Sequence, residues 1–220
     1  MTISPTAPTG TAADRYAPID RARMRELIGE PLGRVLTKKA DHLGELEIRF
    51  IAHAPFMLFA THDRDGRTDC SPRGDAPGFV KVLDPHTLAV PDRFGNKLAE
   101  SMENILVQPQ VGLLFLVPGV RESLRVNGHA FVTDDLPLRR RMTADGKVPD
   151  VAAIVRIDES YLHCGKALIR SGLWDPVTQE YGAALGNARG VWALQAVAEG
   201  DAGAESVTQM NEQLYRDELY

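Results

Sequence analysis

Two short segments combine cations, glycine and polar side chains at spacings suited to binding an anion. The first is SPRGD, residues 71–75, and the second is VPDRFGNK, residues 90–97. In the second segment Asn96 is predicted to cap a helix that begins at Lys97. The positive end of a helix disfavours nearby cations such as Arg93 and Lys97, so a bound anion would stabilise them there. Free backbone N–H groups, an amide and two cations together predict a phosphate cradle.

Each segment alone also fits an ordinary solvated surface. In the second segment Arg93 would pair with Asp92 or Glu100 at the exposed start of the helix. In the first segment Arg73 and Asp75 would form an exposed ion pair of little energetic value. The two interpretations differ in one respect: only a binding site requires the two segments to come together.

The rest of the chain has the pattern of short antiparallel strands. Apolar runs and alternation predict strands over residues 56–62, 67–71, 79–83, 87–90, 111–117, 123–133 and 151–157. Pro72 indicates that the second strand lies at a sheet edge, where a missing N–H does no harm. Helices inserted between strands, rather than alternating with them, argue against a parallel sheet. The prediction is a mainly β, α+β fold: an antiparallel split β-barrel with accessory helices.

Helical spacing and caps predict the accessory helices and the limits of the domain. Helices are expected over residues 20–29, 42–53, 97–106, 136–142, 166–171 and 207–219. Residues 1–17 are rich in Thr, Ala and Pro and are predicted to be flexible. Residues 18–196 would form the barrel domain with its N-terminal helices. Residues 197–220 would form a linker and a C-terminal helix.

The amino-acid composition and net charge disfavour several classes of protein function. The 220 residues are 44% hydrophobic and 25% charged, with a formal net charge of −5. This balance is globular and disfavours binding to nucleic acid or to an anionic membrane through bulk charge. The longest apolar run, residues 111–117, is too short to cross a membrane, and the N-terminus has no secretory signal pattern. We therefore expect a cytoplasmic protein.

The cysteines and histidines form no recognisable metal motif. Cys70 and Cys164 lie far apart, and the six histidines are dispersed without an HxH or HExxH pattern. No metal site is predicted. His163 and Cys164 are adjacent, so on a strand they point to opposite sides and do not form a nucleophile–base pair. Both thiols are predicted to be small packing groups.

The motifs as a set resemble the FMN-binding split-barrel proteins similar to pyridoxamine 5′-phosphate oxidase. The segments that carry the resemblance are SPRGD, FVKVLDPHTLAVPDRFGNKLAESMENI, VGLLFLVPG and ESLRVNGHAFVTDD, the last with a V-x-G-x-A pattern. They extend over residues 45–170 of this chain. The resemblance implies a split barrel, bound FMN and a homodimer with the flavin in a cleft between protomers. It is closest to a branch of the family other than the vitamin B6 oxidase.

The resemblance also implies which residues contact the flavin. Asn96 and Lys97 fall at the FMN phosphate, and Arg93 would replace the basic residue that the family has where Asn96 stands. Ser123 falls where a partner-chain side chain reaches the flavin, with Arg125 on the same strand. Arg73 is expected at the ring or ribityl chain, and Val90 and Pro91 at backbone contacts. The implied cofactor-binding set is Arg73, Val90, Pro91, Arg93, Asn96, Lys97, Ser123 and Arg125.

The C-terminal substrate signature of the B6 oxidase is absent, and HCGKALIRSGLWDP, residues 163–176, stands in its place. Lys166 and Arg170 would share a helix face, and Trp174 would supply a flat apolar wall. These side chains would close over the flavin or its substrate. Alternatively, they would form a surface helix that Trp174 anchors to the barrel.

The predicted function is that of an FMN-dependent oxidoreductase acting on a small molecule through the flavin N5. No general base is assigned. The alternatives are a haem-binding or haem-degrading relative, with a histidine as axial ligand, and a non-catalytic flavin-binding protein. A deazaflavin in place of FMN is a further alternative within the same family resemblance.

Overall fold

The computed structural model describes residues 11–33, 37–95, 97–183 and 213. The chain divides into two compact units, residues 1–37 and 38–220. In the first unit, helix α1 (Arg21–Ile28) begins as predicted, because the carboxylate of Asp20 accepts a hydrogen bond from the Arg23 N–H at 2.8 Å. A short 3₁₀ helix, η1 (Ala12–Arg15), lies within the segment predicted to be flexible.

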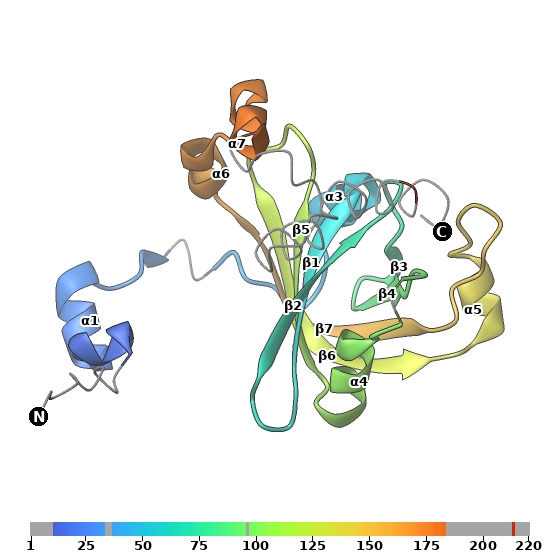
Figure 1. Ribbon diagram of the computed structural model, residues 1–220, viewed down its shortest axis with the longest axis horizontal. Helices are drawn as coiled ribbons and strands as arrows, with labels where there is room; N and C mark the ends of the chain where they lie inside the picture. Colours follow the sequence, from blue (N-terminus) through green and yellow to red (C-terminus); the bar gives the residue numbers. More distant parts are fainter. Residues whose placement is uncertain (1–10, 34–36, 96, 184–212, 214–220) are drawn as a thin grey trace, which may run out of the picture. The chain divides into compact units, whose positions relative to one another are not determined.

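The second unit is built on one antiparallel sheet. Its strands are β1 (Phe56–His62), β2 (Thr68–Gly74), β3 (Lys81–Asp84), β4 (Thr87–Pro91), β5 (Gln110–Leu116), β6 (Ser123–Thr133) and β7 (Ala152–His163). Their order is β2-β1-β5-β6-β7-β4-β3, with β6 and β7 running side by side as the two longest strands (Figure 1). Pro72 lies in the edge strand β2, as predicted. The mainly β, α+β split-barrel architecture is confirmed.

Helices α4 (Glu100–Val107) and α5 (Leu136–Arg140) are inserted between strands, as predicted. Helix α3 (Glu45–His53) precedes β1, and α6 (Lys166–Ser171), η2 (Pro176–Gln179) and α7 (Glu180–Ala183) follow β7. The predicted start of α4 at Lys97 is wrong. Lys97 and Ala99 have left-handed φ angles of 61° and 51°, which a right-handed helix does not tolerate. The predicted C-terminal helix, residues 207–219, lies almost entirely outside the described residues.

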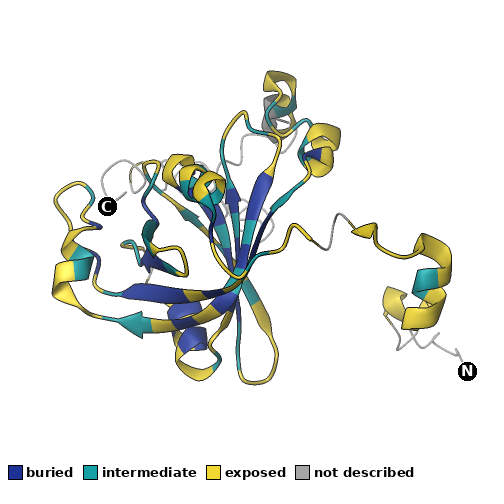
Figure 2. Cartoon of the chain, turned by 180° about the vertical axis from the view of Figure 1, so that it is seen from behind, coloured by how far each residue is buried: buried dark blue, intermediate teal, exposed yellow. Residues whose placement is uncertain are grey.

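Buried residues concentrate in the strands of the second unit (Figure 2). Phe59 and Phe115 are completely buried at the centre of the main cluster. Ile51 of α3 and Ile105 of α4 pack into the same cluster. Each such side chain contributes about 1.5–3 kcal/mol relative to an exposed position. The core therefore fixes α4, and with it the loop that precedes α4.

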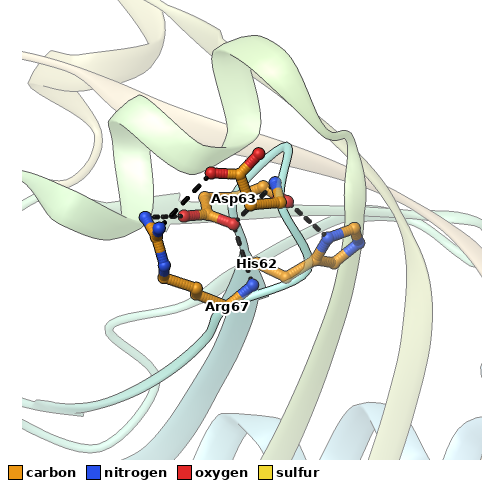
Figure 3. A network of polar contacts seen from close by, with 4 residues as sticks. His62, Asp63 and Arg67 are labelled. Carbon is orange, nitrogen blue, oxygen red and sulfur yellow. Dashed lines mark hydrogen bonds and ion pairs between the residues drawn. The ribbon is translucent and has the colours of Figure 1, made fainter.

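The turn between β1 and β2 is held by one carboxylate. Asp63 Oδ1 accepts hydrogen bonds from the N–H groups of Asp65 and Arg67 at 2.9 and 2.8 Å, while His62 Nδ1 contacts the Asp63 carbonyl oxygen (Figure 3). The Arg67 N–H, followed by the Asp65 N–H and the Arg67 charge, lowers the pKa of Asp63. This network gives β1 and β2 a defined register at the closed end of their hairpin.

A β-bulge between Asn127 and Gly128 brings β6 unusually close to β7. A Cβ atom on Gly128 would overlap the carbonyl oxygen of Arg156 and lie 3.0 Å from its carbonyl carbon. The glycine of the V-x-G-x-A pattern is thus required by the close approach of two backbones. Among the described residues, no helix has the length and apolar character needed to span a bilayer.

Candidate functional site

The two motif segments meet around one hollow of about 860 Å³. The end of β2, the loop from β4 to α4 and the loop from α5 to β7 form its walls. It gathers Arg73, Pro91, Arg93 and Lys97 of the predicted cofactor-binding set. Its volume is within the range of small-molecule sites. The juxtaposition that distinguishes a binding site from two unrelated surface segments is therefore present.

A buried ion pair joins the two segments directly. Arg93 Nε lies 2.5 Å from Asp75 Oδ2, and the two side chains are only 17% and 2% exposed. Arg93 also donates to the carbonyl oxygen of Met142 at 2.5 Å. Arg93 thus pairs with Asp75, not with the local partner Asp92 or Glu100 expected on an ordinary surface. Because Asp75 already offsets its charge, Arg93 shapes the wall of the hollow more than it supplies a free cation.

Arg73 is held in place from the opposite wall. Its Nη2 donates to Ser101 Oγ at 3.1 Å, and the Ser101 hydroxyl donates to Asp69 Oδ2 at 2.8 Å. Its Nη1 donates to the Pro72 carbonyl oxygen at 3.0 Å. The Arg73 Nε atom is buried and makes no hydrogen bond within the described part of the chain. A guanidinium held in place at the lining of a hollow is well suited to contact a ligand oxygen.

The loop before α4 contributes a second cation on a strained backbone. Lys97 is exposed, lines the hollow and has no ion-pair partner among the described residues. A left-handed conformation at a non-glycine residue costs about 1–2 kcal/mol, and Ala99 adopts one as well. Such strain concentrates at functional sites. Asn96, predicted beside Lys97 at the phosphate, lies outside the described residues.

Lys147 is a site residue that the sequence analysis missed. It enters the hollow from the loop between α5 and β7, with its Nζ 5.5 Å from the centre of the Phe94 ring. The Asp145-Gly146 pair before it indicates a tight turn and not ligand binding, so only the fold reveals the role of Lys147. Lys147 brings a cation to the wall opposite Arg73.

Carboxylates also line the hollow and temper its positive field. Burial raises the pKa of Asp92, and the nearby Asp150 carboxylate raises it further while Arg73 lowers it. Glu100 lies in the same lining. Asp92 was visible in the sequence only as an expected partner of Arg93. In the structure it is a half-buried acid facing the same space as the cations.

The remaining predicted residues lie elsewhere on the chain. Ser123, Arg125, Lys166 and Arg170 line a second, smaller hollow of about 370 Å³ at the end of β6 and beside α6. Val90 is completely buried and lines neither hollow. Within one chain, the predicted flavin contacts thus form two separate groups.

Trp174 anchors the segment after α6. Its indole N–H donates to the Val120 carbonyl oxygen at 2.8 Å, and Trp174 lines neither hollow. This placement favours the anchoring alternative over closure of the indole across a ligand.

The predicted packing role of the two thiols is wrong. Cys70 and Cys164 are both exposed, and Cys164 lines the smaller hollow. No group of His, Cys, Asp and Glu side chains able to hold a metal ion is found in the described part of the chain.

Comparisons with known proteins give one family match and several similar solved structures. The family model of pyridoxamine 5′-phosphate oxidase matches residues 47–164, which is more than half of the chain. Similar solved structures include HupZ of Group A Streptococcus (14% identity, 55% of this chain and 93% of that chain, TM-score 0.45). General Stress Protein 26 of Bacillus anthracis is also similar (16% identity, 52% of this chain and 89% of that chain, TM-score 0.40). So is the haem storage protein HutZ of Vibrio cholerae (19% identity, 55% of this chain and 93% of that chain, TM-score 0.40). No curated protein matches the sequence. On the family match, the chain belongs to the pyridoxamine 5′-phosphate oxidase family.

Proposed function

We propose that the larger hollow binds FMN and that the protein is an FMN-dependent oxidoreductase. The observation that carries the proposal is the convergence of the two motif segments, joined by Asp75 and Arg93, around a hollow that Arg73 and Lys97 line. Membership of the family supports it. When bound, the flavin supplies hydride or electron transfer. The residues of this chain bind it, orient it and exclude water from it.

The donor set fits a phosphorylated aromatic ligand. Lys97 and the loop around it would hold the phosphate, with Lys147 as an additional cation across the hollow. Arg73 would hold the ring or ribityl chain through its fixed guanidinium. Pro91 lines the hollow, and the buried Val90 beside it would support that part of the wall. Arg93 would keep the walls in place through Asp75.

The proposal includes a homodimer. Ser123 and Arg125 lie at the smaller hollow, apart from the residues that would hold the phosphate in the same chain. In a twofold dimer the smaller hollow of one protomer would face the flavin of its partner. Light scattering on the purified protein tests this arrangement, and a monomer in the flavin-loaded state would contradict it.

Removing the charges of Arg73 and Lys97 is expected to weaken flavin binding strongly. Each charge-assisted contact contributes about 1.5–3 kcal/mol, so Arg73→Gln combined with Lys97→Asn should weaken FMN affinity at least 100-fold, or by at least about 2.7 kcal/mol. Asparagine is chosen at Lys97 because it tolerates the left-handed backbone. Fluorescence titration of the apoprotein with FMN measures the effect. Equal affinity in the variant would place the phosphate elsewhere.

The matched control is Arg140→Gln with Arg141→Gln. It makes the same change in net charge on exposed residues that line neither hollow. FMN affinity should stay within about twofold of the original protein, because surface charges act weakly at a distance in salt. If the control loses as much FMN affinity as the site variant, the effect comes from net charge and not from the position of the two cations.

The carboxylate in the hollow should oppose binding of a phosphorylated ligand. Asp92→Asn is expected to tighten FMN binding several-fold, because it removes a negative charge that burial already disfavours. The gain should be larger above the pKa of Asp92 than below it, since the acid is neutral at low pH in the original protein. Titrations at two pH values measure this difference. Weaker binding by the variant would mean that Asp92 contacts the ligand as an acceptor.

The visible spectrum of the purified protein separates flavin from haem. Reduction of the bound flavin by NADH or NADPH, followed by reoxidation with candidate acceptors, separates an oxidoreductase from a flavin-binding protein without catalysis. Mass spectrometry of the released ligand distinguishes FMN from a deazaflavin. A haem spectrum, or a flavin inert to every donor, would overturn the corresponding part of the proposal.

A further inference from the structure

The ionic side chains that line the smaller hollow all carry positive charge. Its charged lining residues are Arg125, Lys166 and Arg170, and no Asp or Glu side chain lines it among the described residues. The larger hollow, by contrast, mixes cations with Asp92, Glu100 and Asp150. A concave surface whose ionic groups are all cations favours an anionic occupant.

One of these cations is held rigidly and the other two come from a helix face. Arg125 Nη1 donates to the Tyr161 hydroxyl at 3.0 Å, and its guanidinium lies 5.6 Å from the Tyr161 ring centre. Lys166 and Arg170 are four residues apart on α6, so they share one face. Both are exposed and have no ion-pair partner in the described residues. Two mobile cations thus face a fixed one.

A buried polar atom in the same lining lacks a partner. His163 Nε2 makes no hydrogen bond within the described part of the chain, although the atom is buried. Burial lowers the pKa of His163, and the charges of Arg125, Lys38 and Lys39 lower it further. Burial thus disfavours the charged form of the ring, which lines the hollow without exposing this nitrogen to it.

The floor of the hollow is apolar. Leu114 and Leu116 of β5 and Leu168 of α6 line it. Its volume of about 370 Å³ is near the lower end for small-molecule sites. We propose that this hollow binds a small organic anion, whose acidic group lies between Arg125, Lys166 and Arg170 and whose apolar body packs on the leucines. The anion site itself does not depend on the flavin.

The role of this anion as a substrate rests on the proposed function. In the proposed dimer, Ser123 and Arg125 of one protomer lie beside the flavin of the partner. An organic anion in the smaller hollow would then meet the redox-active ring. The substrate class would be small carboxylates with an apolar portion.

The test is a calorimetric titration of the full chain with 2-naphthoate, with 2-naphthamide and inorganic phosphate as separate probes. We expect 2-naphthoate to bind, and Lys166→Gln with Arg170→Gln to weaken its binding at least tenfold. The control pair Arg140→Gln with Arg141→Gln should leave it unchanged, because those residues line neither hollow. The absorbance of bound flavin, recorded in parallel, should be equal in all three proteins.

Each remaining outcome overturns part or all of the inference. Equal 2-naphthoate binding by the α6 variant, or an equal loss in the control, removes the anion site from this hollow. If 2-naphthamide binds as tightly as 2-naphthoate, the site does not require a negative charge on its ligand. If phosphate binds as tightly as 2-naphthoate, the site does not require an apolar body on its ligand. A protein that takes up no flavin but still binds 2-naphthoate through α6 contradicts the proposed function and leaves the anion site standing.

Discussion

Replacing Gly128 by alanine is expected to destabilise the protein by about 4 kcal/mol or more, a large part of the stability of an ordinary domain. The added methyl group would overlap the carbonyl oxygen of Arg156 and press on Ile157 Cα at 3.3 Å. Both contacts are with backbone atoms of β7, which have no rotamer to change. The overlap can be avoided only if β6 and β7, the two longest strands, move apart at the bulge.

Urea denaturation followed by circular dichroism measures this loss. The matched control is Gly112→Ala on β5, where the new methyl group would lie 3.5 Å from Asn127 Oδ1 and 3.8 Å from Ala60 Cβ. These are ordinary contacts, so the control should change the free energy of unfolding by less than about 1 kcal/mol. If Gly128→Ala is as stable as Gly112→Ala, the close approach of β6 and β7 is not what requires the glycine.

Replacing Asp75 by asparagine is expected to cost about 3–5 kcal/mol, because the buried guanidinium of Arg93 loses its compensating charge. Asparagine keeps the shape of the side chain. It also keeps an oxygen that can accept the hydrogen bond which the Ala76 N–H donates to Asp75 Oδ1 at 2.6 Å. The change therefore isolates the charge. Thermal and urea unfolding of the variant measure the loss, and FMN affinity should fall with it as the two motif segments separate.

A double-mutant cycle tests the coupling of the pair. With Arg93→Gln added, no buried charge is left without a partner, so the double variant should be more stable than the sum of the single losses implies. The exposed pair of Arg67 and Asp65, 3.5 Å apart, serves as a comparison. Asp65→Asn should cost less than about 1 kcal/mol. Additive losses at Asp75 and Arg93 would show that the two side chains act independently.

Strong local patterns predicted much of the fold. The strands over residues 56–62 and 123–133 and the helix over residues 166–171 have the predicted limits. Their alternation or helical spacing is set by the residues themselves. The start of α4 was missed because the left-handed backbone at Lys97 and Ala99 depends on tertiary packing. The strand β7 was predicted to end at residue 157, yet it continues to His163 because one face of an antiparallel strand tolerates polar residues.

The candidate site was predictable in part for the same reason. Arg73 and Lys97 stand in short motifs whose residue types imply anion binding, and the fold brings both to one hollow. The partner of Arg93 was not predictable, since a local rule pairs neighbours and the fold pairs it with a residue of another strand connection. Lys147 was missed because it is placed by a loop without a recognisable binding pattern. Short motifs show which residues could bind a ligand, whereas the contacts between segments distant in the sequence cannot be read from such motifs.

The ion pair between Asp75 and Arg93 has a practical consequence for protein engineering. A designer who transplants SPRGD alone onto another scaffold brings an acid without its counter-ion, and VPDRFGNK alone brings the reverse. Either graft would carry a desolvation penalty into its new host. The two segments are therefore a single transferable module, and libraries that diversify one of them should hold the matching position of the other constant.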